Sequence, residues 1–248
     1  MAFGDGFFET LVYSNGGLRY PAGHLARMQQ AAAALYLRLP HSLATTKALE
    51  TTLAQLAVAN QLPAGRLRLQ LWRAGRGRYT PPTDAVEWLA TAEPFVTDNS
   101  PLQQVDFAQQ TQTVFSPLSF CKGPQAWLYV RAAHERQQRG LDEIILCDAA
   151  GHVAEAGAAA IFWVKDEVLF TPALASGCVA GVRRAAVQQA ALALGIRCQQ
   201  GLFSPADLLD ADAAFTANVA AIRVIHSIQT KKYSTNNPLV TNLLATLS

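Results

Sequence analysis

Cysteine is scarce in this sequence, and its arrangement suits neither metal binding nor cross-linking. The four cysteines among the 248 residues are widely spaced, with no CxxC pair and no cluster of histidines. A zinc site or a disulfide framework would show cysteines at short or regular spacings. We therefore expect neither. Cys147 and Cys198 lie in apolar runs and are interpreted as small core residues.

Charged residues and long apolar runs are also scarce. Charged residues make up 15% of the chain and the formal net charge is +2, which does not favour a nucleic-acid partner. No stretch approaches the roughly 20 apolar residues of a membrane span, and no signal peptide opens the chain. We therefore expect a cytoplasmic enzyme with no membrane partner. The 15 arginines against five lysines fit either bidentate recognition of phosphate or carboxylate or a compositional bias.

The first half of the chain has the pattern of a mixed α+β unit. Apolar residues at Leu25, Met28, Ala32 and Leu35 follow the spacing of an amphipathic helix, and residues 66–72 alternate as in a half-buried strand. The predicted elements are a strand at 7–13 with a Gly16-Gly17 turn, helices at 21–37 and 45–61, and strands at 66–72, 88–96 and 105–115.

The segment 116–123 breaks this pattern and is the predicted domain boundary. A helix follows at 125–139 and ends at Gly140, a favoured helix C-cap. Short strands joined mostly by turns, with no GxGxxG, argue against a Rossmann sheet. The predicted elements there are strands at 143–147, 153–155, 159–164, 168–170, 213–217 and 222–228, a helix at 180–194 and a short C-terminal helix. We predict an α+β fold with a smaller N-terminal domain (1–115), a linker (116–123) and a larger C-terminal domain (124–248).

Several motifs occur in a fixed order along the chain. They are Gly4-Asp5-Gly6-Phe7-Phe8-Glu9-Thr10, His24-Leu25-Ala26-Arg27-Met28, Lys122, Glu135, Gly140-Leu141-Asp142-Glu143, Glu155, Ile161-Phe162, Thr171-Pro172 and Gly181-Val182-Arg183-Arg184. The set resembles that of the fold-type IV pyridoxal 5'-phosphate (PLP) enzymes, the class IV aminotransferase family. This family includes branched-chain and D-amino-acid aminotransferases and 4-amino-4-deoxychorismate lyase. The resemblance covers nearly the whole chain and implies a two-domain fold like that of D-amino-acid aminotransferase, with PLP bound by the larger domain.

The resemblance makes Lys122 the catalytic lysine. A PLP enzyme needs one lysine to hold the cofactor aldehyde and then to act as the base at the substrate carbon. Lys47, Lys165 and the pair Lys231-Lys232 lie in a helix, a turn and a polar tail, where solvated surface charges are usual. Lys122 instead lies between Ser119-Phe120-Cys121 and an apolar helix, a setting that lowers the pKa of an amine.

The resemblance also assigns the residues that hold the cofactor. Glu155 would pair with the protonated pyridine nitrogen, although an exposed turn carboxylate is the alternative from the sequence alone. Backbone N–H groups at a helix start, together with a cation, suit a phosphate. The resemblance assigns the phosphate to Arg27, to Gly181, Val182 and Arg183 at a helix start, and to a second loop with Asn218 and Val219.

Residues 73–81, Arg-Ala-Gly-Arg-Gly-Arg-Tyr-Thr-Pro, resemble the RGxGGRGYxP turn of the lyases but are about two residues shorter. The resemblance implies that Arg76, Arg78 and Tyr79, with Thr10, bind the substrate, because guanidinium groups suit a dicarboxylate. A basic surface hairpin is the alternative. The expected reaction is conversion of 4-amino-4-deoxychorismate to 4-aminobenzoate and pyruvate. A branched-chain or D-amino-acid aminotransferase and a degenerate paralogue acting as a binding module are the alternatives.

Two departures from the family pattern affect the expected details. The family usually has about 20 to 30 residues before its GDG motif, so the chain is expected to be truncated or to start late. Ala160 stands where the family commonly has asparagine, and residues 126–128 match the segment after the lysine poorly. These differences concern the substrate side of the expected site.

The resemblance also implies a homodimer in which a loop of one subunit closes the site of the other.

Overall fold

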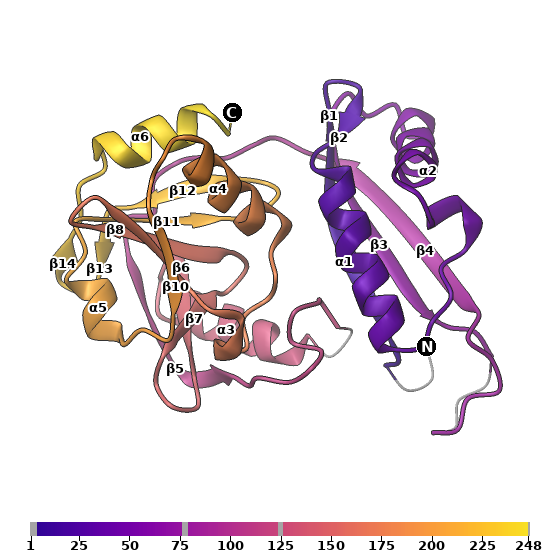
Figure 1. Ribbon diagram of the computed structural model, residues 1–248, viewed down its shortest axis with the longest axis horizontal. Coiled ribbons are helices and arrows are strands. Elements are labelled where there is room, and N and C mark those ends of the chain that lie inside the picture. Colours follow the sequence, from indigo (N-terminus) through magenta and orange to yellow (C-terminus); the bar gives the residue numbers. More distant parts are fainter. Residues whose placement is uncertain (1–3, 76–78, 124–125, 248) are drawn as a thin grey trace. The chain divides into compact units, whose positions relative to one another are not determined.

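The computed structural model describes residues 4–75, 79–123 and 126–247 (Figure 1). The chain divides into two compact units. The first comprises Met1–Thr97 and Cys121–Gln125, and the second comprises Asp98–Phe120 and Ala126–Ser248. The predicted domain limits at 115 and 124 stay a prediction. In this division residues 98–115 belong to the second unit, and Lys122 belongs to the first.

The first unit is a four-stranded antiparallel sheet with two helices (Figure 1). The strand order is β2-β1-β3-β4. Leu67, Leu69 and Leu71 of β3 are fully buried, whereas the alternating Arg66 and Arg68 are exposed on the opposite face. The elements are β1 (Gly6–Ser14), β2 (Gly17–Leu18), α1 (Pro21–Ala34), α2 (Thr46–Ala59), β3 (Gly65–Arg73) and β4 (Val86–Pro94), with a 3₁₀ turn at His41–Leu43.

Local chemistry explains where these elements begin. Pro21 occupies the first turn of α1, where its missing N–H costs nothing. The Thr45 hydroxyl accepts a hydrogen bond from the N–H of Ala48 and caps α2. Gly6, the last residue of the GDG motif, faces Trp72 across the ladder. A Cβ atom at Gly6 would lie 2.1 Å from the carbonyl oxygen of Leu71, so only glycine permits this approach of β1 to β3.

The second unit contains two five-stranded sheets. Their orders are β10-β9-β8-β11-β12 and β14-β13-β5-β6-β7. Most pairs are antiparallel, but β5–β6, β5–β13 and β9–β10 are parallel. The strands are β5 (Val105–Thr113), β6 (Glu143–Asp148), β7 (Val153–Ala156), β8 (Ala160–Lys165), β9 (Val168–Pro172), β10 (Cys198–Gly201), β11 (Ala213–Ala217), β12 (Ile222–Ile225), β13 (Ser227–Ile228) and β14 (Lys231–Lys232).

Apolar residues from both sheets share one core. Val105, Ile145 and Val153 of one sheet pack with Trp163 and Ile225 of the other. The helices of this unit are α3 (Trp127–Gln138), α4 (Val182–Ala193), α5 (Pro205–Leu209) and α6 (Pro238–Ala245), with a 3₁₀ turn at Leu174–Ser176. Mixed helix and sheet in both units agrees with the α+β class that the sequence predicted. Within the described ranges, no helix combines the length and apolarity that a membrane crossing requires.

Candidate functional site

The first unit contains a buried ionic cluster built from the GDG strand and α1. Glu9 of β1 is 1% exposed. The Arg27 guanidinium donates from Nε to Glu9 Oε1 at 2.8 Å and from Nη2 to Glu9 Oε2 at 2.5 Å. His24 Nδ1 lies 2.7 Å from Glu9 Oε2. The spacing of His24 and Arg27 places both on one face of α1, where they reach the same carboxylate.

The charges of this cluster are mutually stabilised. Burial works against ionisation of Glu9, but Arg27 and His24 outweigh it and lower the pKa of this carboxyl to about 2. Burial likewise works against the charge on Arg27, and Glu9 outweighs it and raises the pKa of the guanidinium. Arg27 is thus held charged and in a fixed orientation by its bidentate contact with Glu9.

Lys122 belongs to the same unit as this cluster. The N–H of Phe8 donates to the carbonyl oxygen of Lys122 at 2.9 Å. Lys122 Nζ lies 5.9 Å from the centroid of the Phe8 ring. Burial raises the pKa of the neighbouring Cys121 thiol, and the charge of Arg27 opposes that rise. The segment that carries the lysine therefore lies within electrostatic reach of the Glu9–Arg27 pair.

Arg68 is a residue of this region that the sequence reasoning missed. Its guanidinium carbon lies 3.9 Å from the centroid of the Phe8 ring, so Arg68 and Lys122 approach the same aromatic ring. Thr10, which the resemblance assigned to substrate binding, is paired with Arg68 across β1 and β3 and is half-buried. The alternation of β3 was a usable signal, because it places Arg66 and Arg68 on one face.

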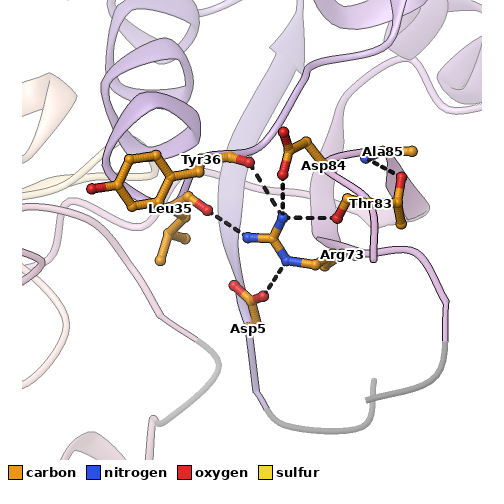
Figure 2. Close-up of polar contacts among 7 residues, drawn as sticks. All are labelled: Asp5, Leu35, Tyr36, Arg73, Thr83, Asp84 and Ala85. Carbon is orange, nitrogen blue, oxygen red and sulfur yellow. Dashed lines mark hydrogen bonds and ion pairs between the residues drawn. The ribbon is translucent and has the colours of Figure 1, made fainter. Parts of the chain in front are cut away.

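Arg73 is the first residue of the arginine-rich segment, residues 73–81, and its side chain also contacts the residues that follow the segment (Figure 2). Its Nε donates to Asp5 Oδ2 at 2.6 Å, and its Nη2 donates to the carbonyl oxygen of Leu35 at 2.6 Å. Its Nη1 donates to the Thr83 carbonyl oxygen and to Asp84 Oδ1, each at 3.0 Å. One guanidinium thus joins the GDG motif, the end of α1 and the far end of the segment.

The predicted substrate residues of this segment are only partly described. Arg76 and Arg78 lie outside the described residues. Tyr79 is described, and its side chain is 96% exposed. The N–H of Ala74 donates to the carbonyl oxygen of Ala85 at 2.8 Å, which closes the base of the segment. Substrate binding by Arg76, Arg78, Tyr79 and Thr10 stays a prediction.

The second unit holds Glu155, which is 4% exposed and lies in β7. The Tyr129 hydroxyl of α3 donates to Glu155 Oε1 at 2.6 Å. The N–H of Val179 donates to Glu155 Oε2 at 3.2 Å. Glu155 is therefore a buried, hydrogen-bonded carboxylate, so the alternative of an exposed turn carboxylate is wrong. Tyr129 was not expected from the sequence, because only the fold brings α3 against β7.

The start of α4 presents backbone N–H groups without a capping side chain. Gly181 is the N-cap residue, and the first helical residues are Val182 and Arg183. Such a helix start attracts anions. The guanidinium of Arg183 donates from Nη2 to the carbonyl oxygen of Leu247 at 2.9 Å. The contribution of Arg183 to an anion at this helix start would therefore come from its backbone N–H.

Asn218 shapes the loop between β11 and β12. Its Oδ1 accepts hydrogen bonds from the N–H groups of Ala220 and Ala221 at 2.9 and 3.0 Å. Its Nδ2 donates to the carbonyl oxygen of Ala158 at 3.1 Å. The side chain thus fixes the conformation of the loop that carries Val219. The other predicted cofactor residues divide between the units, with Arg27 in the first and Glu155, Gly181, Val182 and Arg183 in the second.

Comparison with known protein families identifies the family of this chain. The family model described as "Amino-transferase class IV" matches residues 6–228. The chain belongs to this family. This class IV chain is 29% identical over 231 residues to an aminodeoxychorismate lyase of Vibrio harveyi, covering 87% of the chain and 80% of that relative. It is 26% identical over 249 aligned positions to a D-alanine aminotransferase of Listeria innocua, covering 92% and 80%.

Solved structures of the class IV kind share the fold. A putative 4-amino-4-deoxychorismate lyase from Legionella pneumophila superposes with a TM-score of 0.89 at 20% identity, covering 98% of this chain and 90% of that one. A hypothetical aminotransferase from Mycobacterium tuberculosis in its PLP-bound form superposes with a TM-score of 0.82 at 19% identity, covering 98% and 87%. At these identities the likeness establishes the fold alone.

The class IV family is PLP-dependent, and the described residues of this chain fit that cofactor. The two named donors to the buried Glu155 carboxylate, a hydroxyl and a backbone N–H, are both neutral. A buried carboxylate is stabilised further by a cationic donor such as a protonated ring nitrogen. Within the second unit, the α4 start presents the backbone N–H groups that a phosphate requires. Among the described residues, no group of three or more histidine, cysteine or acidic side chains could hold a metal ion.

Proposed function

We propose that this class IV enzyme is a PLP-dependent lyase that converts 4-amino-4-deoxychorismate to 4-aminobenzoate and pyruvate. The observation that carries the proposal is the likeness to the Vibrio harveyi lyase over 87% of the chain. The lyase-like arginine-rich segment, whose two ends Arg73 anchors, supports it. The similarity to D-alanine aminotransferases keeps a D-amino-acid or branched-chain aminotransferase as the second candidate.

The proposed cofactor residues have distinct tasks. Bound PLP supplies an aldehyde that captures the substrate amine and a ring that withdraws electrons from the amine-bearing carbon. Lys122 holds the aldehyde until the substrate arrives. Glu155, as an ionised carboxylate, accepts a hydrogen bond from the protonated ring nitrogen. The N–H groups of Val182 and Arg183, the loop of Asn218 and Val219, and the guanidinium of Arg27 hold the phosphate.

Lys122 is also the proposed base. Once the substrate amine has replaced it, the free amine of Lys122 accepts the proton from the carbon that bears the substrate nitrogen. The bond between the substrate ring and the enolpyruvyl oxygen then breaks. The substrate ring becomes aromatic as 4-aminobenzoate, and the expelled enolpyruvyl fragment is protonated to pyruvate. The same lysine would serve an aminotransferase, so Lys122 does not distinguish the two activities.

Arg76 and Arg78 are the proposed carboxylate ligands, assisted by Tyr79 and Thr10. The substrate carries two carboxylates, and a guanidinium binds a carboxylate through two parallel hydrogen bonds. Arg68 lies beside Thr10 on the same face and offers a third guanidinium. We further propose that the enzyme is a cytoplasmic homodimer in which this segment of one subunit reaches the site of the other.

Product analysis tests the proposed reaction. The purified protein, loaded with PLP, is incubated with 4-amino-4-deoxychorismate and separately with amino acids plus 2-oxoglutarate. We expect pyruvate and 4-aminobenzoate in equal amounts from the first incubation and no glutamate above background from the second. Glutamate formation without 4-aminobenzoate would establish the aminotransferase instead. PLP binding without turnover in either incubation would favour a binding module.

A further inference from the structure

The surroundings of Glu155 point to a role for Tyr129. The tyrosine hydroxyl and the Val179 N–H each hold one oxygen of the Glu155 carboxylate. The O–O distance of 2.6 Å between Tyr129 and Glu155 is in the range of hydrogen bonds from a hydroxyl to an ionised carboxylate. The two donors come from different elements, α3 and the segment before α4, so the carboxylate is fixed in both position and rotation.

Tyr129 is itself held in place by packing. Its ring packs, together with the side chain of Leu128, against a small core cluster of Ala132, Ile144 and Leu146. The hydroxyl end is turned to Glu155. Burial raises the pKa of Tyr129 far above its ordinary value, and the charge of Glu155 adds to the rise. Tyr129 therefore remains a hydrogen-bond donor at every pH at which the protein would be assayed.

A fixed neutral donor changes the basicity of a carboxylate. A hydrogen bond to the ionised form stabilises that form relative to the protonated acid. A carboxylate stabilised in this way competes less well for a proton that it shares with a ring nitrogen. The proton then stays on the nitrogen, where its positive charge increases electron withdrawal by the ring.

We propose that Tyr129 is a positioning residue that keeps Glu155 ionised and oriented, and thereby keeps the pyridine nitrogen of the bound cofactor protonated. This inference rests on the proposed pairing of Glu155 with that nitrogen. Tyr129 acts through Glu155 and contacts no reacting atom. Its loss therefore changes the protonation of the cofactor and does not remove a catalytic group.

Tyr129→Phe removes the hydroxyl and keeps the ring that packs against Ile144 and Leu146. Tyr233→Phe is the matched control. Tyr233 is a buried tyrosine of the same unit, and its hydroxyl donates to the carbonyl oxygen of Leu208 at 2.9 Å. The control loses a buried tyrosine hydrogen bond of similar length and leaves the contacts of Glu155 intact.

The first measurement needs no cofactor. The carboxyl groups of the apoprotein are labelled with ¹³C-glutamate, and the Glu155 signal is identified by its loss in Glu155→Gln. We expect Tyr129→Phe to raise the titration midpoint of Glu155 by about one to two pH units, the size that follows from losing one charge-assisted hydrogen bond. Tyr233→Phe should leave the midpoint unchanged. An unchanged midpoint in Tyr129→Phe overturns the proposal.

The second measurement follows the cofactor. In protein loaded with PLP carrying ¹⁵N in its ring, the nitrogen signal reports protonation directly. We expect Tyr129→Phe to move the nitrogen signal toward that of an unprotonated ring at neutral pH, because the more basic Glu155 carboxylate takes a larger share of the proton, while Tyr233→Phe matches the wild type. A nitrogen that ignores Tyr129→Phe but responds to Glu155→Gln overturns the role of Tyr129. A nitrogen that ignores both variants overturns this proposal as well, and it places the error in the proposed pairing of Glu155.

Discussion

At the scale of single residues, Lys122 is the group on which the proposed chemistry depends. We expect borohydride to abolish the visible absorbance of the PLP-loaded protein by fixing the cofactor to Lys122. Peptide mapping of the reduced protein checks the site of attachment. Lys122→Ala should lower turnover by several orders of magnitude, because the covalent anchor and the base are lost together. Attachment at Lys47, Lys165, Lys231 or Lys232 would show that the motif assignment is wrong.

The buried Glu9 carboxyl gives a prediction about stability and pH. Its pKa is lowered from 4.5 to about 2, so the unfolded state binds the proton more tightly than the folded state. Its contribution to stability is therefore complete above about pH 4.5 and is lost as the pH falls through about 2. We expect Glu9→Gln to lower the free energy of unfolding at pH 7 by on the order of 3 kcal/mol.

Urea unfolding of wild type and Glu9→Gln between pH 7 and pH 2 measures this effect. The difference between the two proteins should shrink as the pH falls below about 4.5. Glu93→Gln is the control, because Glu93 pairs with Arg66 on the surface, where both side chains are more than half exposed. The control should cost less than about 1 kcal/mol. A Glu9→Gln penalty that does not depend on pH would contradict the ionic origin of the effect.

At the scale of elements, most of the fold could be predicted from periodicity and turn residues. Strand 213–217 was predicted with the bounds that the structure shows, β3 was predicted within one residue at each end, and α2 within two. Helix α1 ends at Ala34, three residues before its predicted end, because Tyr36 adopts a left-handed conformation (φ 54°). The N–H of Leu37 then bonds to the carbonyl oxygen of Ala32, a typical helix C-terminal motif.

The elements that were not predicted have weak local signals. Strand β10 reads Cys-Gln-Gln-Gly, so Cys198 is its one apolar residue and the strand shows no alternation. Its pairing with β9 is a long-range interaction. Helix α5 has only five residues, although Ser204 and Asp207 form a capping box that marks its start. Tertiary contacts likewise could not be predicted from the sequence. The sequence indicated Glu155 through a motif, but Tyr129 approaches it only in the folded chain.

Arg73 is the element-scale case that can be tested directly. Lysine keeps the charge but cannot reach Asp5, the end of α1 and Asp84 at once, because it lacks the guanidinium fork. We expect Arg73→Lys to lower the free energy of unfolding by about 1–3 kcal/mol. We also expect faster cleavage by trypsin after Arg76 or Arg78, which mass spectrometry detects. Arg66→Lys on the same strand has an exposed ion pair only and should change neither.

At the scale of the whole molecule, the question is whether the site is completed by a second subunit. Ultracentrifugation tests the proposed homodimer.

If Arg76 or Arg78 binds a substrate carboxylate, removing that arginine should lower turnover of 4-amino-4-deoxychorismate by about ten- to a hundredfold, the effect of losing roughly 1.5–3 kcal/mol. The absorbance of the bound cofactor should stay unchanged. Wild-type turnover in Arg76→Ala and Arg78→Ala would favour a solvated surface hairpin, and with it the aminotransferase.

Mixed dimers show which subunit supplies the arginines. One parent carries Lys122→Ala, and the other carries Arg76→Ala with Arg78→Ala. A mixed dimer has one site with an intact Lys122, and the Lys122→Ala subunit supplies intact arginines to that site only if the segment crosses the interface. Random mixing in equal amounts makes half of the dimers mixed, so turnover should recover to roughly a quarter of the wild-type value per subunit. If the segment serves its own subunit, mixing restores nothing, because every site then lacks either the lysine or the arginines.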